Sequence, residues 1–217
     1  MQRVVVVDCG SGNLHSVKKA VVRSALDINI EITVNVSSNP KDIVHADRII
    51  LPGVGSYIDC KSGLVAVPGM IDALHEVVIN KGRAFLGICV GMQLLATRGF
   101  EFGETTGFDW IAGDVVAISP KDRSFKIPHM GWNILYKCHD HKLFNGIKFD
   151  YQAPHAYFVH SFHMLPREHK HVLAETDYGC NINAVIGRDN IVGTQFHPEK
   201  SQSLGLQFLK NFLQWFP

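Results

Sequence analysis

Cys89 has the most distinctive surroundings of any cysteine in this chain, because it stands between two glycines in the segment 87–91 (GICVG). An apolar run precedes this segment and a stretch with helical spacing follows it, which predicts a sharp strand-to-helix turn. Such a nucleophile elbow strains the backbone of the nucleophile and leaves room only for glycine beside it. The free N–H groups at the start of the helix favour a thiolate, and the N–H of Val90 can donate to an oxyanion. A small core residue packed between two glycines is the alternative.

A thiolate nucleophile needs a base, and the base needs a group that orients it. The segment 195–201 (QFHPEKS) supplies both, because His197 follows an expected strand and Glu199 lies two residues later. Pro198 between them has a fixed φ angle and no N–H donor. Carboxyl ends of parallel strands meet at one edge of a sheet, so we expect Cys89, His197 and Glu199 to form a triad there. An ordinary surface histidine at a strand end is the alternative for His197.

The segment 51–56 (LPGVGS) follows another expected strand and faces the same edge of the sheet. Its glycines let backbone N–H groups approach a ligand closely, so Gly53 and Val54 are candidates for a second oxyanion donor. A plain turn between a strand and a helix is the alternative. A phosphate-binding loop is disfavoured because no Lys-Ser/Thr pair follows, and the glycines at 10–12 lack the complete dinucleotide-binding pattern.

The elements that position these residues alternate between strand and helix over the first half of the chain. Strands are expected at 3–8, 30–36, 48–51 and 84–88, and helices at 14–25, from 40, at 70–80 and at 91–96. This order predicts one α/β domain, residues 1–217, with a mixed, mainly parallel sheet flanked by helices. Further strands, expected at 115–118, 133–136, 157–162, 171–175, 184–187 and 191–196, predict an antiparallel extension of the same sheet before a last helix at 203–216.

Composition excludes several classes of protein. The net charge is +1, from 21 basic and 20 acidic side chains spread along the chain, so no nucleic-acid-binding surface is indicated. No apolar run approaches the ~18 residues of a membrane helix, and we expect a cytoplasmic protein without membrane contact. The five cysteines are widely spaced and include no CxxC pair, which disfavours a disulfide framework and a zinc site. The closely spaced histidine pairs lack a third ligand, so we expect neither a metal nor another cofactor.

Taken together, the segments 52–55 (PGVG), 87–93 (GICVGMQ), 157–162 (YFVHSF) and 195–201 (QFHPEKS) resemble the class I, or triad, glutamine amidotransferase family over essentially the whole chain. Two further segments, 8–16 (DCGSGNLHS) and 128–133 (PHMGWN), are similar to the glutaminase subunits of imidazole glycerol phosphate synthases. The resemblance implies the flavodoxin-like class I glutaminase fold in a single domain.

The resemblance also implies the chemistry. Cys89 is the nucleophile toward the side-chain amide of L-glutamine, His197 protonates the departing ammonia and then activates water, and Glu199 orients His197. A thioester forms and is hydrolysed to glutamate.

The remaining site residues are implied in the same way. Gln93 and the backbone at Ser161 and Phe162 hold the amino-acid head group of glutamine. Val90 and the peptide of Gly53 and Val54 form the oxyanion hole.

A partner chain is implied as well, a (β/α)8 cyclase that forms a heterodimer with this subunit and receives the ammonia. There ammonia reacts with N'-(5'-phosphoribulosyl)formimino-AICAR-phosphate to give imidazole glycerol phosphate and AICAR. A barrel needs ~250 residues that this chain does not contain. Trp132 is a candidate interface anchor, although a core tryptophan is the alternative, and Asn13 and Lys200 are expected to face the partner. Cys9 stands where Tyr or Thr is more usual, and we expect it only to pack.

Three other functions stay open. A paralogous glutaminase that feeds a surface-sugar amidation enzyme would carry the same motifs, so only its partner and acceptor would distinguish it. A stand-alone cysteine hydrolase is disfavoured by Gln93 and by the unit from His197 to Glu199, which match glutamine handling. A catalytically silent binding module would lack a triad member, and none is missing here.

Overall fold

The main sheet has eight strands in the order β2-β1-β3-β4-β14-β13-β12-β9. It is seen in a computed structural model that describes residues 1–10, 12–122, 124–149 and 153–217. Five strands are parallel: β1 (Gln2–Val7), β2 (Ile32–Ser37), β3 (Arg48–Gly53), β4 (Ala84–Cys89) and β14 (Ile191–Thr194). Three antiparallel strands extend the sheet: β13 (Asn181–Arg188), β12 (Val172–Asp177) and β9 (Tyr136–Lys137).

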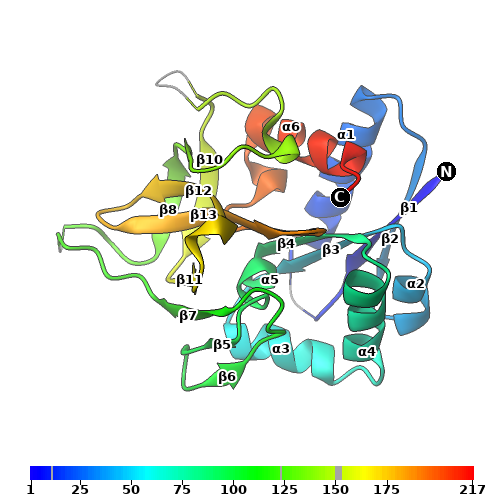
Figure 1. The fold of residues 1–217 in the computed structure, drawn as a ribbon, viewed down its shortest axis with the longest axis horizontal. Coiled ribbons are helices and arrows are strands. Elements are labelled where there is room, and N and C mark those ends of the chain that lie inside the picture. The colour runs from blue at the N-terminus through cyan, green and yellow to red at the C-terminus, as the bar shows by residue number, and fades with distance from the viewer. Residues whose placement is uncertain (11, 123, 150–152) are drawn as a thin grey trace.

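Helices cover both faces of the parallel part (Figure 1). On one face lie α1 (Leu14–Asp27) and α6 (Gln202–Gln214), which pack against each other. On the other lie α3 (Tyr57–Val65) and α4 (Met70–His75), and α4 continues into a π-helical turn at Glu76–Asn80. The short α2 (Pro40–Val44) packs against α4, and the single turn α5 (Val90–Gln93) follows β4 directly. The predicted α/β class is therefore confirmed.

Two smaller sheets are separate from the main sheet (Figure 1). One pairs β8 (His129–Asn133) with β10 (Ala156–His160). The other joins β11 (Phe162–Pro166), β7 (Gly113–Ala117), β5 (Arg98–Gly99) and β6 (Thr105–Thr106). Short 3₁₀ turns occupy Lys142–Phe144, His169–His171 and Pro198–Lys200. The expectation that all later strands extend one sheet was thus only partly right. The strands from β5 to β8, together with β10 and β11, form the two smaller sheets instead.

Helix α3 is the element that sequence periodicity did not indicate. Its first turn is closed by the Ser56 hydroxyl, which accepts a hydrogen bond from the Asp59 N–H at 3.1 Å and donates one to the Asp59 carboxylate at 2.7 Å. Ser and Asp three residues apart at a helix start form a capping pattern, and this pattern was the available signal. The helix matters for function because it begins immediately after the glycine-rich segment 53–55.

The carboxyl end of β4 and the start of α5 are packed directly on β3. A Cβ added to Gly91 would lie 1.9 Å from the Leu51 carbonyl oxygen, and one added to Gly87 would lie 2.5 Å from the Gly91 carbonyl oxygen. Both distances are far inside van der Waals contact, so neither position accepts a side chain without moving the backbone. The absence of two side chains therefore fixes how sharply the chain turns at Cys89.

None of the helices in the described part of the chain is by itself long and apolar enough to cross a membrane, and only the bent pair Tyr57–Val65 and Met70–Asn80, which meet at 97°, reaches that length and composition when taken together.

Gly91→Ala is expected to lower the free energy of unfolding by about 3 kcal/mol, because the new methyl group overlaps the Leu51 carbonyl and forces the elbow apart. Urea denaturation measures the change. Gly82→Ala is the matched control, since Gly82 has φ +63° but open space around it, and it should cost only about 1 kcal/mol. Equal losses in the two variants would contradict a steric role for Gly91.

Candidate active site

Cys89 is the last residue of β4 and precedes α5, with φ 55° and ψ −111°. This is a conformation that residues with a side chain rarely adopt, and such strain persists only where the surrounding packing enforces it. The predicted elbow at Cys89 is therefore present in the structure. The following helix is one turn, Val90–Gln93, rather than the six residues expected, so the dipole of a long helix does not act on the sulfur.

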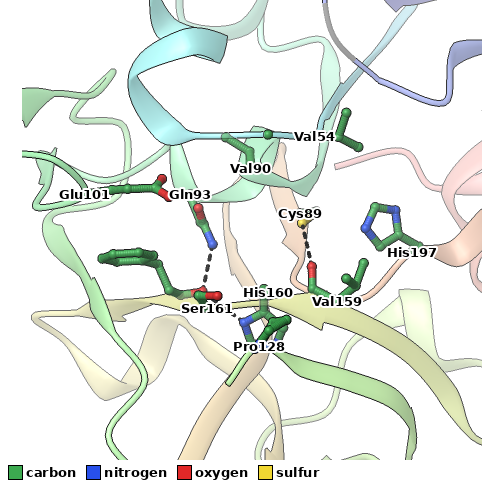
Figure 2. A pocket seen from close by; sticks show the side chains of 12 residues that line it. Val54, Cys89, Val90, Gln93, Glu101, Pro128, Val159, His160, Ser161 and His197 are labelled. Carbon is green, nitrogen blue, oxygen red and sulfur yellow. Dashed lines mark hydrogen bonds between the residues drawn. The ribbon is translucent and has the colours of Figure 1, made fainter. Parts of the chain in front are cut away.

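A cavity of about 310 Å³ opens over the Cys89 sulfur at the carboxyl edge of the sheet (Figure 2). It brings together residues from six separate parts of the chain: the 54–55 loop, the segment 89–93, Glu101, Pro128, the segment 159–162 and His197 after β14. Figure 2 shows the side chains of Cys89, at the end of β4, and of His197, which follows the neighbouring strand β14, among the residues that line this cavity. Its lining consists of Val54, Gly55, Cys89, Val90, Gln93, Glu101, Pro128, Val159, His160, Ser161, Phe162 and His197.

The orientation of His197 is fixed from several directions. Its Nδ1 lies 2.9 Å from Glu199 Oε1, and its backbone N–H donates to the Tyr157 carbonyl at 2.9 Å. Its carbonyl oxygen accepts from the Ser201 hydroxyl at 2.7 Å, and that hydroxyl also accepts from the Tyr157 N–H. Ser201 is fully buried and is a positioning residue that the sequence analysis missed.

The ring of His197 and the carboxylate of Glu199 are almost completely buried, with side-chain exposures of 3% and 1%. Within the described residues, His197 Nε2 has no hydrogen-bond partner, and neither has Glu199 Oε2. The imidazole thus presents one nitrogen to Glu199 and leaves the other available, as a general base beside a nucleophile requires.

The pKa of His197 results from opposing effects. Burial lowers it, but attraction to an ionised Cys89 sulfur and the hydrogen bond to Glu199 outweigh burial and raise the pKa to about 10. The three other histidines close to the site behave in the opposite way. Burial lowers the pKa of His160 to about 3 and of His129 and His163 to about 4, so they are neutral at neutral pH. Among these four rings, His197 is therefore the one whose pKa is raised and which is protonated at neutral pH.

Two glutamines connect the cavity wall to the nucleophile. The Gln93 side-chain amide donates to the Phe162 carbonyl at 2.9 Å and to Gln195 Oε1 at 3.1 Å. Gln195 Nε2 in turn lies 3.7 Å from Cys89 Sγ. Gln93 was predicted to face the site, whereas Gln195 was not singled out. Its signal was its place directly after β14, where a fully buried amide beside the nucleophile needs polar partners.

The structure divides the expected oxyanion residues. Val54 and Val90 line the cavity, while Gly53 pairs with Cys89 across the parallel strands and lies beneath the lining. A Cβ on Gly53 would lie 2.9 Å from Val90 Cβ, so glycine at position 53 allows the end of β3 and the start of α5 to come into contact. Gly55, with φ +87°, lines the cavity in addition. Val54 is 36% exposed and stands at the rim.

Ser161 and Phe162 line the same cavity as Gln93, and Figure 2 shows Ser161 close to Gln93. The Phe162 carbonyl also accepts from His160 Nδ1 at 2.9 Å, which leaves His160 Nε2 to accept from His129 Nδ1 at 3.1 Å. Glu101 is a further lining residue that the sequence analysis missed. One of its oxygens accepts from the Tyr57 N–H at 2.7 Å, and its position at the rim places a carboxylate in the cavity wall.

Trp132 and Lys200 belong to one surface cluster with Tyr157. The Trp132 ring meets the Tyr157 ring edge-on at 5.6 Å, and Lys200 Nζ lies 5.5 Å from the Tyr157 ring centre. Trp132 is 48% exposed, so the alternative of a core tryptophan is wrong. Asn13 precedes α1, which packs against the 198–200 turn from another side.

Residues 5–215 match the family model described as glutamine amidotransferase class-I. The chain therefore belongs to the class I glutamine amidotransferase family.

Its curated relatives include three proteins named imidazole glycerol phosphate synthase subunit HisH. The one from Brucella melitensis is 52% identical over 215 residues, and the one from Rhizobium meliloti is 51% identical over 215; each alignment covers 99% of this chain and 100% of the relative. The one from Rhodopseudomonas palustris is 50% identical over 214 residues, with 99% of each chain covered.

Solved structures agree on the fold. A crystal structure of a glutamine amidotransferase matches with a TM-score of 0.68 at 18% identity, covering 96% of this chain and 98% of that one. A glutamine amidotransferase from Thermotoga maritima matches with a TM-score of 0.58 at 18% identity, covering 91% and 76%.

Cys89→Ser and Glu199→Gln are each expected to lower the pKa of His197, because each removes a charge that raises it while burial continues to lower it. Imidazole nitrogen shifts in an NMR titration measure the change. His163, whose pKa is lowered by burial alone, is the internal control and should stay neutral in all three proteins. An unchanged His197 pKa in Cys89→Ser would contradict electrostatic coupling between the two residues.

Gln195→Leu is expected to lower kcat/KM for glutamine about tenfold, because it removes the hydrogen bonds that tie Gln93 to the Cys89 sulfur. Gln207→Leu is the matched control, since Gln207 also donates through its amide, to Asn211 at 3.0 Å, but lies on α6 away from the cavity. Steady-state glutaminase kinetics compare the two variants. Equal effects would show that Gln195 acts only through stability.

Proposed function

We propose that this chain is the glutaminase subunit of an imidazole glycerol phosphate synthase, which hydrolyses L-glutamine to glutamate and ammonia and passes the ammonia to a cyclase subunit. The observation that carries the proposal is that Cys89 and His197 line the same cavity, with Glu199 hydrogen-bonded to the other side of the imidazole. The curated relatives of the same length, which bear the HisH name, support the choice of pathway.

In the proposed reaction the Cys89 sulfur attacks the side-chain amide carbon of glutamine and forms a tetrahedral intermediate. The carbon–nitrogen bond then breaks, His197 gives its proton to the leaving nitrogen, and ammonia departs from a thioester. His197 next takes a proton from water, and the resulting hydroxide attacks the thioester and releases glutamate and the thiolate. The pKa of His197 near 10 fits the first step, since the ring starts out protonated beside the sulfur anion.

The oxyanion of both intermediates is proposed to lie between the Val90 N–H and the peptide of Gly53 and Val54. Preorganised backbone donors of this kind stabilise charge that develops in the transition state. The close contact between Gly53 and Val90 supports the pairing of these two donor elements.

The amino-acid head group of glutamine is proposed to bind at the other end of the cavity. The Gln93 amide and the backbone at Ser161 and Phe162 face the substrate there. The Glu101 carboxylate adds a negative charge suited to the α-ammonium group of an amino acid. Hydrogen-bond donors for an α-carboxylate and a carboxylate for an α-ammonium group favour a free amino acid over a substrate that lacks these two charged groups.

A (β/α)8 cyclase is the proposed partner in a heterodimer, and the cluster of Trp132, Tyr157 and Lys200 is the proposed docking surface, with Asn13 facing the partner nearby. An aromatic anchor beside a cation is typical of interface hot spots. Lys200 follows the 197–199 unit directly, so partner binding can reach the triad through a short path. One amidotransferase domain over residues 1–217 and a cytoplasmic location stay predictions.

The experiment that tests the proposal is a glutaminase assay of the chain alone, with a candidate cyclase, and with cyclase plus its ribonucleotide ligand. We expect weak activity alone and strong stimulation in the full mixture, and Cys89→Ala should reduce the stimulated rate by at least ~10³-fold. Lys200→Ala should reduce the stimulation while leaving the triad intact. No activity under any condition would favour the surface-sugar pathway or a silent module, and strong activity alone would favour an independent hydrolase.

A further inference from the structure

Two buried thiols lie in contact beneath the glycine-rich loop. Cys9, just after β1, and Cys60, in the middle of α3, have their sulfur atoms 3.3 Å apart. The exposures of the two residues are 4% and 0%. The Cys9 thiol also lies 3.7 Å from the Pro52 carbonyl oxygen, at the end of the strand that leads into the loop. The sequence placed these residues 51 positions apart and gave no reason to pair them, and Cys9 was expected only to pack.

The backbone of α3 is also in contact with the backbone of Cys9. A Cβ added to Gly63, one turn after Cys60 on α3, would lie 1.9 Å from the Cys9 carbonyl oxygen. Helix α3 therefore rests on the Cys9 backbone with no space for even a methyl group. A disulfide requires the Cα atoms of its two cysteines to lie a few ångströms apart, and the tight packing of α3 on Cys9, together with the contact between the two sulfurs, favours that arrangement.

We propose that Cys9 and Cys60 are an oxidisable dithiol, which a peroxide converts to a disulfide across the floor of the 53–56 loop. One sulfur attacks a peroxide oxygen, the oxygen–oxygen bond breaks, and a sulfenic acid and one water form. The second sulfur attacks the sulfenic sulfur, the sulfur–oxygen bond breaks, and the leaving hydroxide takes the second thiol proton to give another water. Each sulfur loses one electron, and the two peroxide oxygens gain both.

The environment sets the rate and the kind of oxidant. The hydrogen bond to Cys9, together with burial, raises the pKa of the Cys60 thiol well above its ordinary value, so little thiolate is present at neutral pH. Oxidation is accordingly slow, accelerates with rising pH, and favours a small uncharged oxidant such as hydrogen peroxide. Once one sulfur is oxidised the other is already in contact, so the disulfide forms ahead of further oxidation.

Closing the bond changes the loop above it. The sulfurs must approach from 3.3 Å to about 2.05 Å. Because the backbones of α3 and Cys9 are already in contact, this approach requires the Cys9 and Cys60 side chains themselves to move. A Cβ on Gly53 would lie 3.1 Å from the Cys60 sulfur, so the loop residue and this thiol are neighbours. In the disulfide, the Cys9 sulfur also no longer carries the proton that it can donate to the Pro52 carbonyl. The disulfide therefore shifts the proposed oxyanion segment and slows glutamine hydrolysis. This effect on rate rests on the proposed function, whereas formation of the crosslink does not depend on it.

The crosslink is tested in the full chain carrying Cys89→Ser, which removes the catalytic thiol. The protein is treated with hydrogen peroxide, denatured in iodoacetamide without reductant, digested and analysed by mass spectrometry. We expect a linked pair of peptides containing Cys9 and Cys60, faster formation at higher pH, and loss of the link in matched Cys60→Ser and Cys9→Ala chains. The proposal would be overturned if Cys9 and Cys60 were still alkylated by iodoacetamide under conditions that had already oxidised Cys138 and Cys180.

The effect on rate is tested in chains that retain Cys89. The natural chain and Cys60→Ser, each with the cyclase and its ligand, are treated with hydrogen peroxide, which is then removed. Glutaminase rates are measured before and after addition of dithiothreitol. Each rate is expressed relative to the rate of the same protein before oxidation. The oxidised natural chain should be about tenfold slower than oxidised Cys60→Ser, and dithiothreitol should remove the difference. Equal rates would overturn the effect on the loop, while inactive reduced chains would instead reject the proposed glutaminase function.

Discussion

The close contact between Gly91 and the Leu51 carbonyl is the constraint on which the site depends. Because a side chain at Gly91 would overlap this oxygen, the chain must approach β3 as bare backbone, and it can do so only by turning sharply at Cys89. The turn forces Cys89 to φ 55° and points its sulfur away from the sheet and into the cavity. A local steric requirement thus places the sulfur of a residue that is only 4% exposed on the lining of the cavity.

The second requirement is electrostatic. His197 and Glu199 are buried deeply enough that an isolated charge on either would be costly, and a carboxylate held by a single hydrogen bond is poorly compensated. Attraction between an ionised Cys89 sulfur and a protonated imidazole offsets this cost, which is why the pKa of His197 rises despite burial. The charge of the His197 imidazole therefore depends on both neighbours, and replacing either Cys89 or Glu199 lowers its pKa.

Packing around this centre consists of polar side chains whose partners come from distant segments. Gln93 and Gln195 connect the wall at Phe162 to the nucleophile, and Ser201 ties His197 to Tyr157. The segment from 156 to 166 supplies partners to both sets, although it contributes no strand to the main sheet. Departure of β10 and β11 from that sheet is what allows them to stand over its carboxyl edge and enclose the cavity.

The sequence alone predicted the parallel core, the turn at Cys89 and the contact between His197 and Glu199, because each depends on local pattern: strand runs that end at glycines, and a histidine and glutamate two positions apart. The catalytic roles of these residues stay a prediction. The sequence did not reveal α3, whose apolar periodicity is weak and whose start is marked only by Ser56 and Asp59. Only the tertiary structure decided that Gln195 lies against Cys89, that Glu101 enters the cavity and that Cys9 touches Cys60. These contacts join residues 44 to 106 positions apart, and the distance between such residues is set by how β1, β3, β4, β14 and α3 pack, which no local spacing encodes.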